Sequence, residues 1–197
     1  MTTDVTPDPP GVDWPAQAVD QLDWHWRTQL RPRLDGLTDA EYLWEPTPGA
    51  WNVRPRGTGT APVQAGSGAM TVDFALPPPE PAPMTTIAWR VAHLVVGVFG
   101  ARVASHFGGP ACDYATFAYP ATATEALRLL DEGYAAWRAG VRGWQEDGSL
   151  GLPCGPAERP WGGQPRGALV LHINREVIHH GAEISLLRDL YVHRIAH

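Results

Sequence analysis

Residues 170–191, VLHINREVIHHGAEISLLRDLY, combine an apolar stripe with a dense group of side chains that can bind metal ions. Apolar positions three and four residues apart lie on one face of an α-helix, so the stretch predicts an amphipathic helix over about 166–193. The stripe consists of Val170, Ile173, Val177, His180, Ile184, Leu187 and Tyr191. His180 is therefore expected to face the core.

Glu176 precedes His180 by four residues and shares its helix face. Residues with this spacing are about 5–6 Å apart at Cβ, so both side chains can reach one ion. A neutral imidazole nitrogen and a carboxylate are good ligands for a divalent transition metal. The pair alone is a frequent pattern, and a histidine on an apolar face is often an ordinary hydrogen-bonded core residue. A metal site needs a third ligand from another helix.

Three further helices are predicted upstream, over about 16–35, 86–107 and from the capping box at Thr122 onward. Pro32 is expected to kink or end the first of them. The first has a stripe of Val19, Leu22, Trp26 and Leu30, and the third has a longer stripe of Leu127, Leu130, Tyr134, Trp137, Val141 and Trp144. Four long amphipathic helices with little strand predict an all-α four-helix bundle.

Two Gly/Pro-rich segments, 54–84 and 145–167, interrupt the helices. A loop as long as 54–84 in a compact domain is either functional or disordered, although the alternation in MTVDFAL (70–76) could form an extended segment. Residues 1–15 are expected to form a flexible tail, and 16–197 a single domain.

His93 is the obvious third ligand, because the helix over 86–107 is apolar on nearly every side and should be buried. His25 and His106 are weaker candidates because they lie nearer helix edges or ends. Burial of His93, Glu176 and His180 without partners would be costly, and one metal ion would satisfy all three.

Four other polar residues lie close to these candidates in the predicted helices. His179 points about 100° away from its neighbour and is expected at the surface or in an interhelical hydrogen bond. Glu183 could orient a ligand or be an ordinary surface carboxylate. His172 could line a pocket mouth or be a solvated residue, and Arg90 could bind an anionic group or form an interhelical ion pair.

Composition and charge exclude several classes of protein. The net charge is −6 with no dense Lys/Arg run, which argues against nucleic acid as a partner. The start, MTTDVTPDPPGVDWP, lacks the basic and apolar regions of a signal peptide, and no stretch approaches the roughly 20 apolar residues of a membrane helix. Cys112 and Cys154 are expected to be unpaired, as in a reducing cytoplasm.

Three segments carry a resemblance to a known family: LTDAEYLWEPTPGAWNVRP (37–55), TTIAWRVAHLVVG (85–97) and HINREVIHHGAEISLLRDLY (172–191). In this order they resemble the DinB/YfiT-like superfamily of metalloenzymes. The resemblance implies a four-helix bundle with a long crossover, here at 107–121, and a homodimer. It also implies a ligand set of His93, Glu176 and His180.

Glu176 stands where many members of that superfamily have histidine. The His/Glu/His set is similar to that of the mycothiol-dependent maleylpyruvate isomerase N-terminal domain. This similarity implies a divalent ion, zinc first with nickel or iron as alternatives, that activates the thiol of mycothiol. The isomerase has a further C-terminal domain without a counterpart here, and 54–84 is longer than usual. The resemblance therefore implies the metal and not the isomerase substrate.

The leading hypothesis is a cytoplasmic enzyme that activates a mycothiol-like thiol for S-transfer or isomerisation of a small electrophile. Segments 54–84 and 145–167 could close over its site. One alternative is a metal-dependent hydrolase with an activated water. Another is a non-catalytic dimeric bundle that binds a ligand or partner. Neither nucleic acid nor a membrane is an expected partner.

Overall fold

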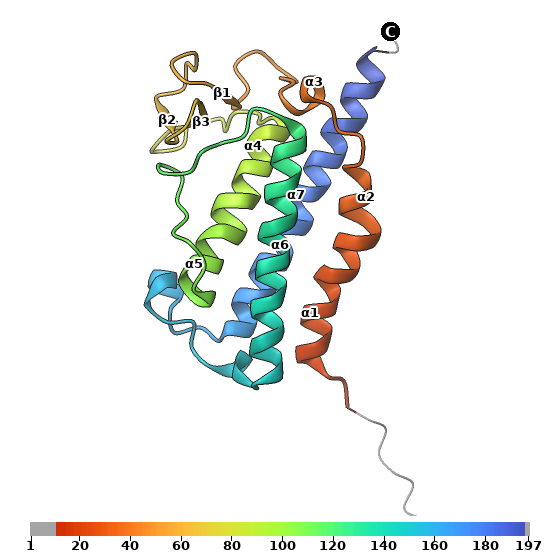
Figure 1. Ribbon diagram of the computed structural model, residues 1–197, viewed down its shortest axis with the longest axis vertical. Coiled ribbons are helices and arrows are strands. Elements are labelled where there is room, and N and C mark those ends of the chain that lie inside the picture. Colours follow the sequence, from red (N-terminus) through yellow and green to blue (C-terminus); the bar gives the residue numbers. More distant parts are fainter. Residues whose placement is uncertain (1–10, 196–197) are drawn as a thin grey trace, which may run out of the picture.

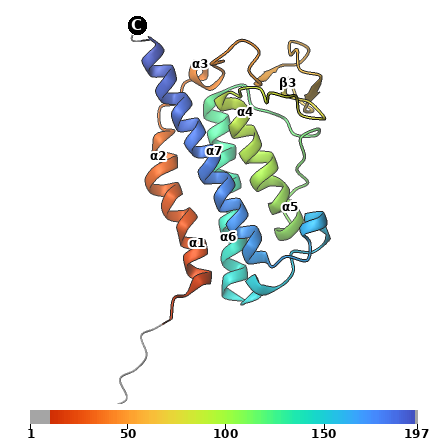
Figure 2. The same cartoon turned by 180° about the vertical axis from the view of Figure 1, so that it is seen from behind.

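The computed structural model describes residues 11–195 and places four long helical rods side by side (Figures 1 and 2). Rod 1 comprises α1 (Trp14–His25), a π-helical segment (Trp26–Leu30) and α2 (Arg31–Arg33). Rod 2 comprises α4 (Ile87–Ala92), a π-helical segment (His93–Gly100) and α5 (Ala101–Phe107). Rods 3 and 4 are α6 (Ala123–Glu146) and α7 (Arg166–Ile195). Rods 1 and 2 each pack against both α6 and α7.

Rod 1 begins at Trp14, two residues before the predicted start. The Asp13 carboxylate accepts a hydrogen bond from the Ala16 backbone N–H at 3.0 Å. A proline lies in the first turn, where a backbone N–H has no partner within the helix, so its missing N–H costs nothing. The rod ends at Arg33, one residue after Pro32, so the proline ends the helix as expected. Residues 1–10 of the predicted tail lie outside the described residues.

The predicted apolar stripes form the core. Thr122 caps α6 by accepting a hydrogen bond from the Glu125 backbone at 3.3 Å. Every stripe residue of rod 1 and of α6 is buried, and the α7 stripe is buried from Val170 to Leu187. The rings of Trp26 and Tyr134 stack at 3.9 Å between centroids, which joins rod 1 to α6.

The segment predicted as a long loop contains a small antiparallel sheet, so the chain is mostly helical and not all-α. The strands are β1 (Val53–Pro55), β2 (Val63–Ala65) and β3 (Met70–Phe74), in the order β1-β3-β2. The MTVDFAL alternation supplies the central strand. The short helix α3 (Asp39–Tyr42) precedes the sheet, which lies beside the start of α4 (Figure 1). The two outer strands, β1 and β2, escaped prediction because glycines and prolines dominate the composition around them.

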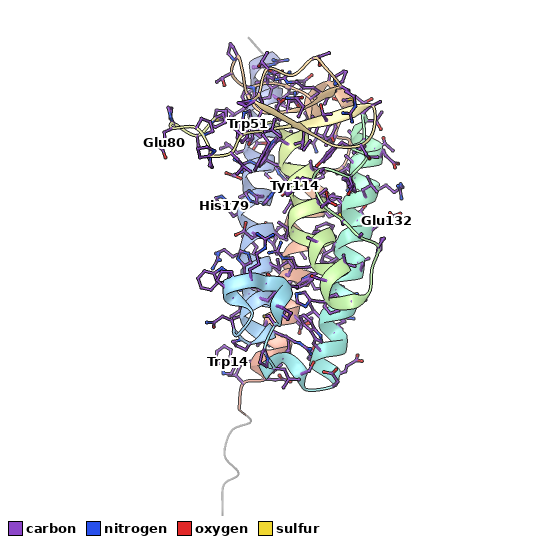
Figure 3. The ribbon with its side chains drawn as sticks, turned by 90° about the vertical axis from the view of Figure 1, so that its left-hand side faces the viewer. Trp14, Trp51, Glu80, Tyr114, Glu132 and His179 are labelled. Carbon is purple, nitrogen blue, oxygen red and sulfur yellow. The ribbon has the colours of Figure 1, made fainter. Side chains whose placement is uncertain are left out.

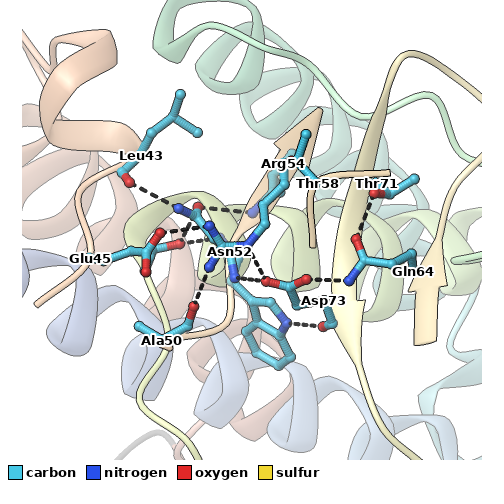
Figure 4. A network of polar contacts seen from close by, with 12 residues as sticks. Leu43, Glu45, Ala50, Asn52, Arg54, Thr58, Gln64, Thr71 and Asp73 are labelled. Carbon is cyan, nitrogen blue, oxygen red and sulfur yellow. Dashed lines mark hydrogen bonds and ion pairs between the residues drawn. The ribbon is translucent and has the colours of Figure 1, made fainter. Parts of the chain in front are cut away.

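Asp73 of β3 ties the sheet to the helices (Figure 4). Its carboxylate accepts hydrogen bonds from the Asn52 backbone at 3.0 Å and the Arg54 side chain at 2.8 Å. Its backbone oxygen accepts a hydrogen bond from the Trp89 indole at 2.8 Å. Because Trp89 belongs to α4, the sheet fixes the first turns of rod 2.

Rod 2, Ile87–Phe107, is 21 residues long and has the length and apolarity of a membrane-spanning helix. The expectation that no stretch approaches this length was therefore wrong. Half of its most apolar window is buried inside the molecule, where rod 2 packs against α6 and α7. The apolar composition is thus explained by its place in the core.

Asp23 is a buried carboxylate that links rod 1 to α6. Tyr134 donates a hydrogen bond to it at 2.6 Å, and the Arg138 and Arg27 guanidiniums each approach it to 2.5 Å. Burial raises the pKa of Asp23, but the hydrogen bonds from Tyr134 and Arg138 and the two positive charges outweigh burial and lower it. The carboxylate is ionised in the folded protein.

Asp23→Ala should reduce the free energy of unfolding by about 1–3 kcal/mol at pH 7, because it leaves the buried Tyr134 hydroxyl and the partly buried Arg138 without their partner. The native pKa of Asp23 is lower than its unfolded pKa, so its contribution is present at neutral pH and is lost as the pH falls through the native value. Urea titrations between pH 3 and pH 7 measure both effects. A loss no greater than that of the exposed control Asp20→Ala would contradict this account.

Candidate metal centre

Glu176 and His180 lie one turn apart on α7, as their spacing predicts. A Glu176 carboxylate oxygen (Oε2) lies 3.4 Å from Nε2 of His180. His180 is 8% exposed, while Glu176 is partly exposed. The pair therefore has one buried imidazole and one carboxylate that solvent can reach.

His93 of rod 2 meets this pair from the neighbouring helix. Its Nε2 lies 4.0 Å from the same Glu176 oxygen, and its ring meets the His180 ring edge to face at 4.8 Å between centroids. One ligand atom of each residue lies within 4.8 Å of those of the other two. A distance of this size leaves space for one ion between them. The structure brings together the three residues that the sequence nominated.

His93 is held in the neutral form that a metal ligand requires. Burial first, and the neighbouring His180 second, lower its pKa to about 4. Its ring stacks on Trp89 at 5.7 Å, and its Nδ1 lies 2.6 Å from the Tyr114 hydroxyl. With Nε2 turned to an ion, Nδ1 would carry the ring proton and donate a hydrogen bond to the Tyr114 hydroxyl. This second hydrogen bond fixes the ring orientation.

Tyr114 is the functional residue that the sequence analysis missed. It lies on the connection between α5 and α6, beside rod 2 (Figure 3), and burial raises its pKa to about 12. A Cβ at Gly97 would overlap the Tyr114 hydroxyl and lie 3.1 Å from Nδ1 of His93. Glycine at 97, four residues after His93, makes room for the tyrosine. No local sequence signal relates a tyrosine in a Gly/Pro-rich connection to a histidine in the preceding helix.

Glu183 and Arg90 hold the other nitrogen of His180. Glu183 lies 2.7 Å from Nδ1 of His180, and the Arg90 guanidinium lies 3.0 Å from the same Glu183 oxygen. Arginine has no acceptor, so the carboxylate accepts from both Nδ1–H and the guanidinium. Nε2 of His180 then presents its lone pair to the Glu176 side. Glu183 thus contacts the His180 ring, and Arg90 forms an ion pair with it across rod 2 and α7, which was one of the two alternatives for Arg90.

His179 points away from the centre, as predicted, toward the outer edge of α7 (Figure 3). Its Nε2 lies 3.5 Å from the second Glu183 oxygen. His179, His180 and Glu183 also have the spacing of a cation site, but the Arg90 guanidinium lies 3.1 Å from Nδ1 of His180. The guanidinium thus supplies the positive charge at this second position.

The remaining candidates lie apart from the centre. His106 pairs with Glu158 at 2.9 Å, and His25 belongs to neither cation grouping found in residues 11–195. Cys112 and Cys154 are both unpaired, as predicted, and burial raises the pKa of each thiol. Neither cysteine is therefore a ready thiolate.

A cleft of about 540 Å³ opens beside the centre, toward the start of α7. Its walls come from α5, α7 and the turn Pro156–Trp161, and include Arg102, Glu158, Trp161, Leu169, His172 and Arg175. Nδ1 of His172 lies 3.6 Å from a Glu176 oxygen. His172 therefore lies between the cleft and the candidate metal centre. This position corresponds to the first of its two alternatives, a residue at the mouth of a pocket.

A sequence model of the DinB superfamily matches residues 61–184, which is more than half of the chain and includes His93, Glu176 and His180. The chain belongs to the DinB superfamily. No curated protein and no solved structure matches the chain.

Gly97→Ala should destabilise the protein, because the added methyl displaces the Tyr114 hydroxyl. In a Tyr114→Phe background the hydroxyl is absent and the same substitution should cost less, with a coupling energy of about 0.5–3 kcal/mol in a double-mutant cycle. Gly143→Ala on α6 is the control, because a Cβ there meets nothing within 4 Å and should stabilise by up to about 1 kcal/mol. Strictly additive Gly97 and Tyr114 effects would contradict the proposed contact.

Proposed function

We propose that the four rods form a DinB-type four-helix bundle in which His93, Glu176 and His180 hold one divalent transition metal ion. The observation that carries this proposal is the convergence of their three ligand atoms across the seam between rod 2 and α7. Two imidazoles and one carboxylate suit zinc, with nickel or iron as alternatives, and leave a coordination position for a substrate. The hydrogen bonds from the far nitrogens, Nδ1 of His93 to Tyr114 and Nδ1 of His180 to Glu183, match the usual support of metal-binding histidines.

We further propose that the protein is a thiol S-transferase or isomerase that uses an external, mycothiol-like thiol. A bound divalent ion would lower the pKa of a coordinated thiol and supply a thiolate at neutral pH. The protein's own cysteines do not serve, because burial raises the pKa of both. The thiolate sulfur would add to one carbon of an activated double bond, and the π electron pair of that bond would move to the neighbouring carbon. Return of the thiol proton to that carbon would give a conjugate, whereas return of the electron pair with cleavage of the carbon–sulfur bond would expel the thiolate and give an isomer. The proposal is supported by the His/Glu/His set, which is similar to that of the mycothiol-dependent maleylpyruvate isomerase N-terminal domain.

The chain's own residues have three tasks in this scheme. Tyr114 and Glu183 hold the two imidazoles with their Nε2 lone pairs toward the site. Arg90 balances the Glu183 charge, so that this carboxylate does not attract a second cation. The cleft toward His172 gives a small molecule access to Glu176.

We also propose a cytoplasmic homodimer. Exposed apolar residues follow one face of α7: Ala182, Leu186 and Leu190 are four positions apart, and Leu171 lies eleven positions earlier on the same face. A second copy would remove this face from water. Sedimentation velocity of wild type and Leu186→Glu, with Leu152→Glu as an exposed control elsewhere, tests this proposal. A monomeric wild type would refute it.

Elemental analysis of protein purified without an affinity tag should find about one divalent metal ion per chain. His93→Ala should lose most of it, because two ligands from one helix are not enough to hold the ion. The matched control is His179→Ala, which removes an exposed imidazole beside the site and should keep the metal. Equal metal content in wild type and His93→Ala would refute the proposed centre.

The absorption spectrum of cobalt-substituted protein should change on titration with millimolar mycothiol, because a thiolate ligand adds intense sulfur-to-cobalt bands. As the control, titration with an alcohol analogue, in which a hydroxyl group replaces the thiol, should leave the spectrum unchanged. An unchanged spectrum with mycothiol would refute thiol activation. Turnover of ester or amide substrates would then favour the hydrolase, and the absence of turnover would favour a binding bundle.

A further inference from the structure

The cleft beside the metal centre holds an arginine without a carboxylate partner. Nη2 of Arg175 lies 2.8 Å from Nδ1 of His172, and within residues 11–195 no acidic side chain forms an ion pair with its guanidinium. Glu158, the acidic residue of the cleft wall, already pairs with Arg102 at 3.3 Å and with His106 at 2.9 Å. Arg175 is exposed, so its planar donors remain available to a ligand in the cleft.

An apolar surface faces the same space. Trp161 lines the cleft with 67% of its surface exposed, and the buried Leu169 lies at the cleft wall. An exposed indole without a covering element offers a flat face for an unsaturated or aromatic group. The cleft therefore combines one unpartnered planar cation with one free aromatic face.

The turn that carries Trp161 is held in a strained conformation. Arg159, two residues earlier, has φ 52° and ψ −120°, and among residues 11–195 it is the one non-glycine residue with positive φ. Its neighbour Glu158 points inward to Arg102, while a Cβ at Gly162 would lie 2.5 Å from the Gly155 carbonyl oxygen. Such strain persists where the surroundings fix the backbone, and it clusters at binding sites.

The cleft leads to the metal centre along α7. His172 precedes Glu176 by four residues, which is a rise of about 6 Å along the helix. Arg102, on the opposite wall, donates a hydrogen bond to the carbonyl of Gly97, next to His93 and Tyr114. Because His172 borders both the cleft and Glu176, a small molecule that touches Arg175 can reach toward the Glu176 carboxylate.

We infer that this cleft is the binding site for a small organic carboxylate with an aromatic or unsaturated body. The carboxylate is recognised by the planar fork of Arg175, which matches its two oxygens. The body lies against Trp161, and its far end points past His172 toward the metal centre. This assignment names the substrate class for the proposed metalloenzyme and rests on that function. A neutral ligand of the same shape lacks the negative charge and the second acceptor oxygen that the Arg175 guanidinium would bind.

Calorimetric titration with benzoate and with its neutral isostere benzamide tests the assignment. The protein as purified and after chelator treatment should bind benzoate at least about tenfold more tightly than benzamide, since hydrogen bonds to a charged group contribute that much. Arg175→Gln should remove the preference in both preparations, and Trp161→Ala should weaken both ligands. Arg142→Gln on α6 makes the same change of charge away from the cleft and should bind as wild type does.

Equal binding of benzoate and benzamide, or unchanged benzoate affinity in Arg175→Gln with a wild-type melting curve, would overturn the inference. These outcomes are distinct from failure of the metal centre. Benzoate binding after chelation does not require the ion, and metal content is measured separately on His93→Ala. Benzoate binding that persists in Arg175→Gln but vanishes after chelation would place the carboxylate on the metal and also overturn it.

Discussion

A polar seam between the apolar rod 2 and the core-facing side of the amphipathic helix α7 is the constraint on which this structure depends. Rod 2 and α7 run in opposite directions through the core, and at one level they bring His93, Glu176 and His180 to within 4.8 Å of one another. Polar side chains at such a seam are costly unless each has a partner. The surrounding residues satisfy the far nitrogen of each imidazole and leave the near atoms converging on one point.

Two segments outside the four rods, the small sheet and the connection after α5, support the residues of this seam. Three strands occupy the segment between rod 1 and rod 2, and Asp73 ties them to Trp89, whose ring stacks on His93. The connection after α5 supplies Tyr114 to the other side of the same imidazole. His93 thereby contacts two aromatic side chains, Trp89 of α4 and Tyr114 of the connection after α5. A rigid ligand set is the expected consequence, since supporting contacts of this kind tune metal affinity.

Charged groups are distributed unevenly around the seam, so its two sides differ in what they offer a ligand. On one side Arg90 neutralises Glu183, so that region offers no free charge. On the other side the cleft offers Arg175 and Trp161 to a ligand. The superfamily membership supports a metal-associated role, and the proposed ligand cleft lies on the side where a cation is free.

The sequence by itself determined the rods and nominated His93, Glu176 and His180 as the residues that meet. Stripes with 3-4 spacing predict the helices within two or three residues, since burial of an apolar face requires that period. The Glu176–His180 pair follows from the same period, and His93 from its place in a helix apolar on nearly every side. The tertiary structure alone decided the sheet, the Tyr114 contact, the Arg90–Glu183 ion pair and the cleft. Each of these joins residues from separate segments, and their positions depend on packing geometry that no local period encodes.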